Sequence, residues 1–132
     1  MHEVQIILSE IIMVENQLVT LSRKFAVNMI HLCDEVKSRG KATAISNQLL
    51  RSGTSIGANI HEGNYASSRS DFINRFQIAL KECYETDYWL SVFYEAEIIS
   101  KEEFDSAILQ CSKIRKLLIA SITTAKKNAA TR

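Results

Sequence analysis

The sequence predicts an all-α protein that folds as an antiparallel, left-handed four-helix bundle with up-down-up-down topology. Apolar residues recur at spacings of three and four along four long stretches, which is the periodicity of amphipathic helices. Proline is absent and glycine occurs only four times, too few for the turns of a hairpin-rich β fold. The breaks between the stretches are short, roughly two to five residues, and loops of that length join antiparallel neighbours because they cannot cross the length of a bundle.

The first helix is expected from about Glu15 to Arg39, with Gly40 placed to end it in a left-handed conformation. The apolar pattern continues upstream with weaker spacing, and Met13 offers a second initiation point. The upstream residues are therefore expected to be an extension that is either helical or disordered. The expected organisation is an N-terminal extension at residues 1–14, the bundle at 15–127 and a frayed tail at 128–132.

The second helix is expected to begin after Lys41, with Thr43 as its N-cap, and to end near Tyr65 or Ala66. It has two faces whose spacings fit a helix and not a strand. The apolar face comprises Leu49, Gly53, Ile56 and Ile60, and the polar face comprises Arg51, Ser55, Asn59 and Glu62.

The third and fourth helices have recognisable starts. Ser68 or Ser70 caps the third, and Ser68 with Asp71 fits a capping box. Its apolar residues alternate at four and three over three heptads, the pattern of left-handed packing at about 20°. Ser100 with Glu103 forms a second capping box and starts the fourth helix.

A second polar set on the third helix is expected to form a cross-helix network with the polar face of the second helix. Gly53 and Gly57 are expected to let these two helices approach closely enough, and the Arg51 guanidinium can bind a carboxylate through two N–H groups. We expect the network to fix helix register or an interface, because buried polar groups must satisfy one another. A catalytic carboxylate pair is the alternative, but no nucleophile with a base and no glycine-rich phosphate loop accompanies it, so we expect no enzyme. The third-helix residues of the network are Lys81, Glu82, Glu85, Tyr88 and Trp89.

Neither a metal nor a cofactor is expected. Cys33, Cys83 and Cys111 are far apart without a CxxC motif, which indicates buried reduced thiols and a cytoplasmic setting. The Glu-x-x-His motif of di-metal bundles is absent, and His31 points away from Cys33 on a helix. No uninterrupted apolar run reaches the roughly 20 residues of a membrane span, and the start lacks a basic region before its apolar residues, so we expect no membrane partner.

The charge is nearly balanced, with a formal net charge of +1, but it is unevenly placed. From Cys111 onwards the chain has basic residues and no acidic ones, and the first helix adds further cations. Phosphate contact with RNA or DNA is the functional interpretation, and a solvated basic face is the alternative. The candidate nucleic-acid contacts are Lys113, Arg115, Lys116, Lys126 and Lys127.

Aromatic residues on the third helix predict an oligomer. Tyr84, Tyr88, Trp89 and Tyr94 join three phenylalanines on this helix, and one core-facing seam cannot bury them all. Tyrosine and tryptophan that face away from a core are common interface anchors.

Four segments resemble the four-helix bundle family named after 23S rRNA intervening sequences. They are FAVNMIHLCDEV, QLLRSGTSIGANIHEG, DFINRFQIALKECYETDYWL and the closing helix. The resemblance covers about Leu18 to Lys127 and leaves residues 1–14 without a counterpart. The signature positions are Arg51, Ser52, Gly53, Ser55, Gly57, Asn59, Glu62, Lys81, Glu82, Glu85, Tyr88 and Trp89.

The resemblance implies a bacterial protein that forms a ring-like homopentamer. Some members are encoded inside intervening sequences of 23S ribosomal RNA genes, and a related branch, the accessory proteins of diversity-generating retroelements, binds nucleic acid and a reverse transcriptase. Most members have no established biochemical activity. We therefore expect a non-enzymatic, homo-oligomeric bundle that binds RNA or DNA through basic residues of its first and fourth helices. The alternative is a protein–protein interaction scaffold or adaptor.

Overall fold

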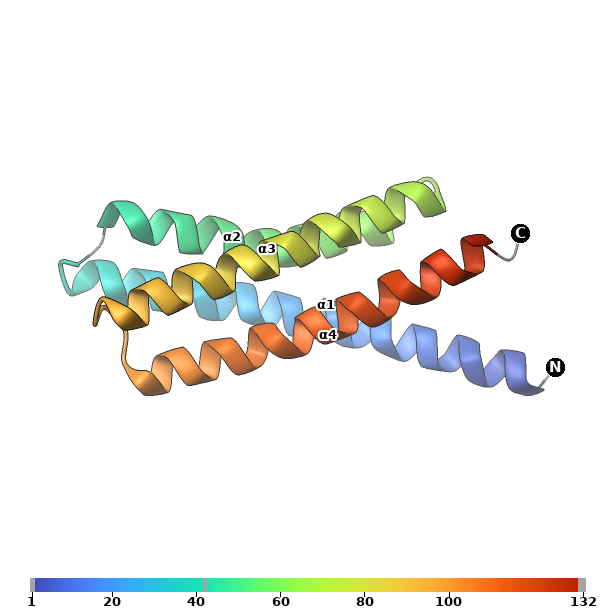
Figure 1. Ribbon diagram of the computed structural model, residues 1–132, viewed down its shortest axis with the longest axis horizontal. Coiled ribbons are helices and arrows are strands. Elements are labelled where there is room, and N and C mark those ends of the chain that lie inside the picture. The colour runs from blue at the N-terminus through green and yellow to red at the C-terminus, as the bar shows by residue number, and fades with distance from the viewer. Residues whose placement is uncertain (1, 42, 131–132) are drawn as a thin grey trace.

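The computed structural model describes residues 2–41 and 43–130, and in these ranges the chain forms four α-helices. Each helix runs antiparallel to the next, and both chain termini lie at the same end of the molecule (Figure 1). The predicted all-α, four-helix bundle is confirmed. The helices are α1 (His2–Ser38), α2 (Thr43–Asn64), α3 (Arg69–Glu95) and α4 (Lys101–Ala130).

α1 is much longer than its expected span, because residues 2–14 are helical and continue into the rest of the helix without a break. At its other end α1 stops at Ser38, and Gly40 adopts a φ of 74°, the left-handed conformation expected of a residue that ends a helix. The Gly40 N–H donates to the Lys37 carbonyl over 2.9 Å, which satisfies one of the last carbonyls of the helix.

The starts of α3 and α4 follow the predicted capping boxes. The Asp71 N–H donates to the Ser68 hydroxyl over 3.1 Å, so Ser68 is the cap and Ser70 lies inside the helix. For α4 both halves of the box form: the Ser100 N–H donates to Glu103 over 2.8 Å, and the Glu103 N–H donates to the Ser100 hydroxyl over 3.1 Å. The predicted capping by the Thr43 side chain lies outside what the structure describes.

α4 continues to Ala130, so residues 128–130 of the expected frayed tail are helical, and residues 131–132 lie outside the described chain.

The core contains the residues of the three-and-four spacing. Phe25, Phe76 and Phe93 are its largest buried side chains. Two hydroxyls are buried among them: the Thr86 Oγ1–H donates to Ser52 Oγ over 3.0 Å, and the Ser52 hydroxyl is also within 3.3 Å of the Leu49 carbonyl. This pair joins α2 to α3 and satisfies both hydroxyls inside the core.

The glycines of α2 face a different helix from the one expected. A Cβ atom on Gly53 would lie 2.7 Å from Cγ of Met29, and one on Gly57 would lie 3.2 Å from the carbonyl oxygen of Ser22. Both neighbours belong to α1, so these glycines bring α2 close to α1 and not to α3. The expectation that they enable the α2–α3 polar network was wrong, because the glycines lie on a different side of α2 from Arg51.

Candidate functional site

The centre of the predicted polar network forms between α2 and α3. One guanidinium nitrogen of Arg51 lies 3.3 Å from both carboxylate oxygens of Glu82, and the other donates to Glu85. The Trp89 indole N–H donates to the same Glu85 oxygen over 3.3 Å. The hydrogen bond to Glu85, partly offset by desolvation, raises the pKa of the Arg51 guanidinium above its ordinary value. We call Arg51, Glu82, Glu85 and Trp89 the Arg51 cluster.

Two further residues of the predicted network serve their own helix. The Ser55 hydroxyl donates to the Arg51 carbonyl over 2.6 Å, and the Asn59 amide donates to the Ser55 carbonyl over 2.9 Å. Serine and asparagine readily bond to the carbonyl one turn earlier, so their place on the polar face did not make them cross-helix partners.

The last three predicted members lie outside the Arg51 cluster. Glu62 pairs with Arg75 of α3 over 2.8 Å. Lys81 is exposed and makes no ion pair within the described chain, and Tyr88 is exposed with its ring nearly perpendicular to that of Trp89. The network is therefore smaller than predicted, and its two carboxylates are held by one guanidinium.

Arg115, predicted to contact nucleic acid, is instead bound to α3. Its guanidinium donates to Asp87 over 2.9 Å and to the Ser112 hydroxyl over 3.3 Å, and it lies 5.7 Å from the centre of the Tyr84 ring. The side chains of Arg115 and Asp87 are only 29% and 23% exposed. The other Asp87 oxygen, Oδ1, is buried without a hydrogen-bond partner in the described structure. Arg115 is thus the counter-ion of a half-buried carboxylate. The apolar spacing of the fourth helix places either Ile114 or Arg115 on the core-facing side, and this was the one sequence signal of the inward position of Arg115.

The other predicted cations of α4 are exposed. Lys113, Lys116, Lys126 and Lys127 make no ion pair within residues 2–41 and 43–130. No acidic residue follows Asp105 in the chain. We call these four residues the α4 lysines.

One exposed cation of α1 lies on the same side of an α1–α4 contact as Lys113. The Asn28 amide donates to the Gln110 side chain over 2.8 Å, which fixes where α1 and α4 meet. Lys24 is exposed one turn before Asn28, and Lys113 comes three residues after Gln110. Because the helices are antiparallel, Lys24 and Lys113 lie on the same side of this contact.

At the opposite end of α1 the cations are engaged. Arg39 binds Glu103 over 3.0 Å, and the Lys37 ammonium donates to the Asn47 side chain over 2.7 Å. Their availability to a phosphate is correspondingly lower than that of Lys24.

The three cysteines are buried, free thiols. Burial raises the pKa of Cys33 to about 11, and contact with Cys83 together with burial raises the pKa of Cys111 further. Cys33 and Cys111 therefore stay protonated at neutral pH. Within the described chain, no three side chains of histidine, cysteine, aspartate or glutamate come together as metal ligands.

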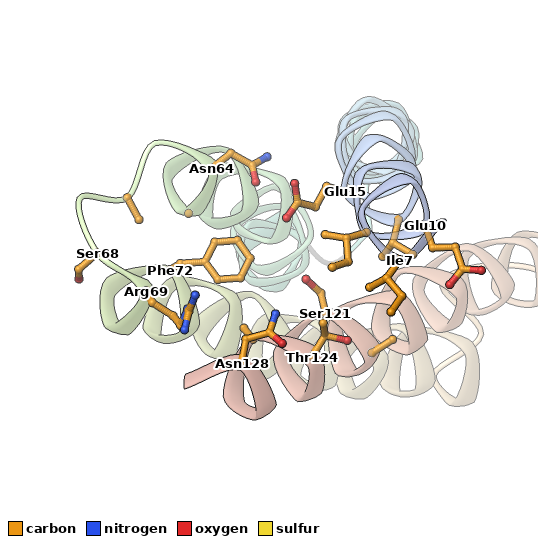
Figure 2. Close-up of a pocket in the computed structure, with 16 residues that line it drawn as sticks. Ile7, Glu10, Glu15, Asn64, Ser68, Arg69, Phe72, Ser121, Thr124 and Asn128 are labelled. Carbon is orange, nitrogen blue, oxygen red and sulfur yellow. The ribbon is translucent and has the colours of Figure 1, made fainter. Parts of the chain in front are cut away.

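A cavity of about 540 Å³ lies at the end of the bundle that carries the termini. Figure 2 shows Ile7 and Glu15 of α1, Phe72 of α3 and Ser121 of α4 around it. Burial raises the pKa of the Glu15 carboxyl above its ordinary value. Sequence reasoning did not identify this cavity, because it depends on how far the helices diverge at their ends.

Among the described helices, α1 alone has the length and apolar composition to cross a membrane. The apolar stretch responsible for this lies near the N-terminus and is almost entirely exposed. The same test is met by core helices and signal sequences, so the expected absence of a membrane partner stays a prediction.

Comparison with known proteins places the bundle in a family. No curated protein matches the chain. A solved structure from Bacteroides thetaiotaomicron, described as a protein with unknown function from the S23 ribosomal protein family, is 44% identical and superposes with a TM-score of 0.82. The match covers 83% of this chain and 98% of that one. The family model for the 23S rRNA-intervening sequence protein matches residues 14–120, well over half of the chain. The chain therefore belongs to the 23S rRNA-intervening sequence protein family.

Proposed function

We propose that this protein is a non-enzymatic, homo-oligomeric, cytoplasmic bundle that binds RNA or DNA through the α4 lysines and Lys24. The observation that carries the proposal is that these cations are exposed, lack ion pairs within the described chain, and have no acidic residue beside them in the second half of α4. Unpaired lysines release counterions when they meet phosphates, which is the main source of sequence-independent affinity.

The spacing of the lysines suits an extended contact. Lys113 and Lys127 are fourteen residues apart, four helical turns, and so lie on nearly the same face of α4 about 21 Å apart. Lys116 lies close to that face, and Lys24 widens it towards α1. A single copy offers few contacts, so binding of useful strength needs several copies side by side.

The aromatic side chains of α3 support an oligomer. Tyr88 is 60% exposed and lies against the half-buried Trp89, and Tyr84 is 52% exposed and lies beside Arg115. Exposed tyrosines, and above all one that lies against a tryptophan, are typical of interface anchors. The number of five copies rests on the family resemblance alone.

The absence of enzymatic activity is supported by the chemistry of the Arg51 cluster. A general acid or base needs a carboxylate that is free to exchange a proton, and both Glu82 and Glu85 are hydrogen-bonded to Arg51. The related solved structure is itself described as a protein of unknown function, so it gives no evidence for an enzymatic activity.

Fluorescence anisotropy with a structured RNA and with duplex DNA tests the proposal. The variant K113E/K116E/K127E is expected to bind at least about tenfold more weakly than the wild type, because each contact contributes to the electrostatic term. Lys81→Glu is the matched control, since Lys81 is an exposed, unpaired lysine on α3. The proposal fails if the wild type shows no salt-sensitive binding, or if the control loses as much affinity as the triple variant.

A protein scaffold is the second candidate, favoured by the exposed tyrosines of α3. It predicts that the assembled protein recovers a specific partner after nuclease treatment and that Tyr88→Ala abolishes the recovery. Recovery that disappears with nuclease treatment would instead indicate a nucleic-acid tether.

A further inference from the structure

At the end of the bundle that carries the termini, two helices continue without the other two. α2 and α3 are joined by a turn between Asn64 and Arg69, whereas α1 extends beyond that turn (Figure 1). We call residues 2–13 of α1 the N-terminal arm. Its apolar side chains other than Ile11 are about half exposed to solvent in the described chain: Val4, Ile6, Ile7, Leu8, Ile12 and Met13.

The arm carries the same seam as the core. Val4, Ile7, Ile11 and Val14 are spaced three, four and three, and Leu18, four residues further on, is fully buried in the core. In the body of the bundle this seam packs against the other helices. Along the arm the apolar spacing continues although α2 and α3 have ended. Such spacing suits packing against several helices, and this copy does not supply all of them.

The cavity lies beside the arm and has walls that a helix can approach. It is bounded by the arm, by the turn between α2 and α3, and by the last turns of α4 (Figure 2). Phe72, Ile11 and Val14 provide apolar surface. Much of the remaining wall consists of small residues, which allow a close approach of another backbone: Gly63, Ala66, Ala120, Ser121 and Ala125.

We propose that the same end of a second copy of this chain docks here with two-fold symmetry. The arm of each copy then lies against the cavity and the α4 end of the other copy. Two arms and two α4 ends together form a four-helix core, with the same number of helices as the body of the bundle.

The arm and the end of α4 carry opposite charges, while the cavity wall between them contains Glu10, Glu15 and Arg69. The arm contains Glu3 and Glu10 and no lysine or arginine, whereas the end of α4 contains Lys126 and Lys127 and no acidic residue. A two-fold pairing sets the acidic arm of one copy against the basic helix end of the other, and each contact occurs twice.

The same charges disfavour a lipid bilayer as the occupant. Helices that lie on membranes are usually rich in lysine and arginine, and the first basic residue of the described chain after His2 is Arg23. A spanning helix would bury the carboxylates of Glu10 and Glu15 in hydrocarbon, which is costly.

The arm and the charged end of α4 lie outside the part of the chain that the family model matches, which is residues 14–120, whereas much of the cavity wall, including Gly63 and Phe72, lies inside it. The arm pairing is therefore additional to any assembly through the shared bundle. Because Lys126 and Lys127 are also proposed phosphate contacts, nucleic acid competes with the arm for them, and the pairing is therefore tested on nuclease-treated protein.

The mass of the full-length protein, measured by light scattering after size-exclusion chromatography, tests the pairing. The variant Ile7→Ser/Leu8→Ser is expected to have half the mass of the wild type, whatever the assembly of the bundle itself. Val27→Ser/Leu109→Ser is the matched control, because these side chains are 47% and 59% exposed, close to the 54% and 52% of Ile7 and Leu8, and lie on the bundle body. An arm variant with unchanged mass, or with less than half the wild-type mass, would overturn the two-fold pairing.

A charge exchange tests the orientation. Glu3→Lys/Glu10→Lys and Lys126→Glu/Lys127→Glu are each expected to weaken the association of the two halves by about tenfold or more, and a chain with all four changes is expected to recover it. No recovery in the fourfold variant would refute the proposed contact between the arm and the α4 end. Flotation of the wild type, but not of the arm variant, with vesicles of mixed phosphatidylcholine and phosphatidylglycerol would show that lipid is the occupant and would also overturn the proposal.

Discussion

Replacing Arg115 separates a structural role from a nucleic-acid role more clearly than any other change in the chain. In Arg115→Met the apolar stem of the side chain is kept and the guanidinium is lost. Asp87 would then lose its 2.9 Å partner while its other oxygen, Oδ1, is already buried without one in the described structure. An unpaired carboxylate in this position must be desolvated without compensation.

The cost can be estimated from burial. Breaking a fully buried ion pair costs roughly 3–5 kcal/mol, and the 23–29% exposure of these two side chains reduces the cost to about 2–4 kcal/mol. For a domain of this size that corresponds to a fall of roughly 6–16 °C in Tm. The assay is thermal unfolding followed by circular dichroism at a fixed protein concentration, because association makes Tm depend on concentration.

Two comparisons make the result decisive. Lys113→Met, an exposed lysine on the same helix, is expected to change stability by less than about 0.5 kcal/mol. The double variant Asp87→Leu/Arg115→Met is expected to recover much of the loss, because two apolar residues leave no charge to satisfy. If Arg115→Met unfolds at the wild-type temperature but loses nucleic-acid affinity, the structural assignment of Arg115 is wrong.

Three further changes follow from the structure. Arg51→Ala is expected to lower the free energy of unfolding, measured in urea, by about 1–2 kcal/mol, which is less than the loss of a fully buried pair, because the Arg51 side chain is 49% exposed. A loss equal to that of Arg115→Met would contradict this. Gly63→Ala places a Cβ atom 2.7 Å from the buried Phe76 ring and is expected to cost about 1–3 kcal/mol in the same assay, so a more stable variant would show that the ring can move. The pKa of the Glu15 carboxyl is higher in the folded protein than in the unfolded chain, so its charge destabilises the fold above that pKa, and this penalty disappears as the pH falls below the unfolded value. Glu15→Gln is therefore expected to stabilise the protein by less than about 1 kcal/mol at pH 7 and to have no effect at pH 3. An equal effect at both pH values would exclude the titration of Glu15 as its cause.

Helical spacing and capping chemistry determine most of the fold. The spacing of three and four identified the side chains that became buried, such as Phe25, Phe76 and Leu118. The serine-based capping boxes located the starts of α3 and α4, because a side chain that bonds to a nearby N–H acts within a few residues.

Contacts between helices were harder to predict, because spacing shows which residues share a face but not which helix that face meets. Gly53 and Gly57 were assigned to the contact with α3 and instead meet α1. Arg51 was placed correctly beside Glu82 and Glu85, whereas Glu62 pairs with Arg75, a residue outside the predicted set. The rotation of each helix about its axis decides these partners, and small differences in packing set that rotation.

The number of basic residues in α4 does not show which of their side chains are exposed. Arg115 and Lys113 are two residues apart and equally basic in the sequence, yet one is an internal counter-ion and the other is exposed. The direction of a side chain on its helix separates the two, and this could be anticipated only from the apolar residues around Arg115.

The salt dependence of RNA binding tests the central proposal most directly. If the α4 lysines contact phosphates, the slope of the logarithm of the binding constant against the logarithm of salt concentration falls by about 0.7–0.9 for each contact removed. K113E/K116E/K127E is then expected to flatten the slope by about two units or more, while Arg115→Met, measured below its melting temperature, is expected to keep the wild-type slope. An unchanged slope in the triple lysine variant, or a flattened slope in Arg115→Met alone, would contradict the assignment of the α4 lysines as the nucleic-acid interface.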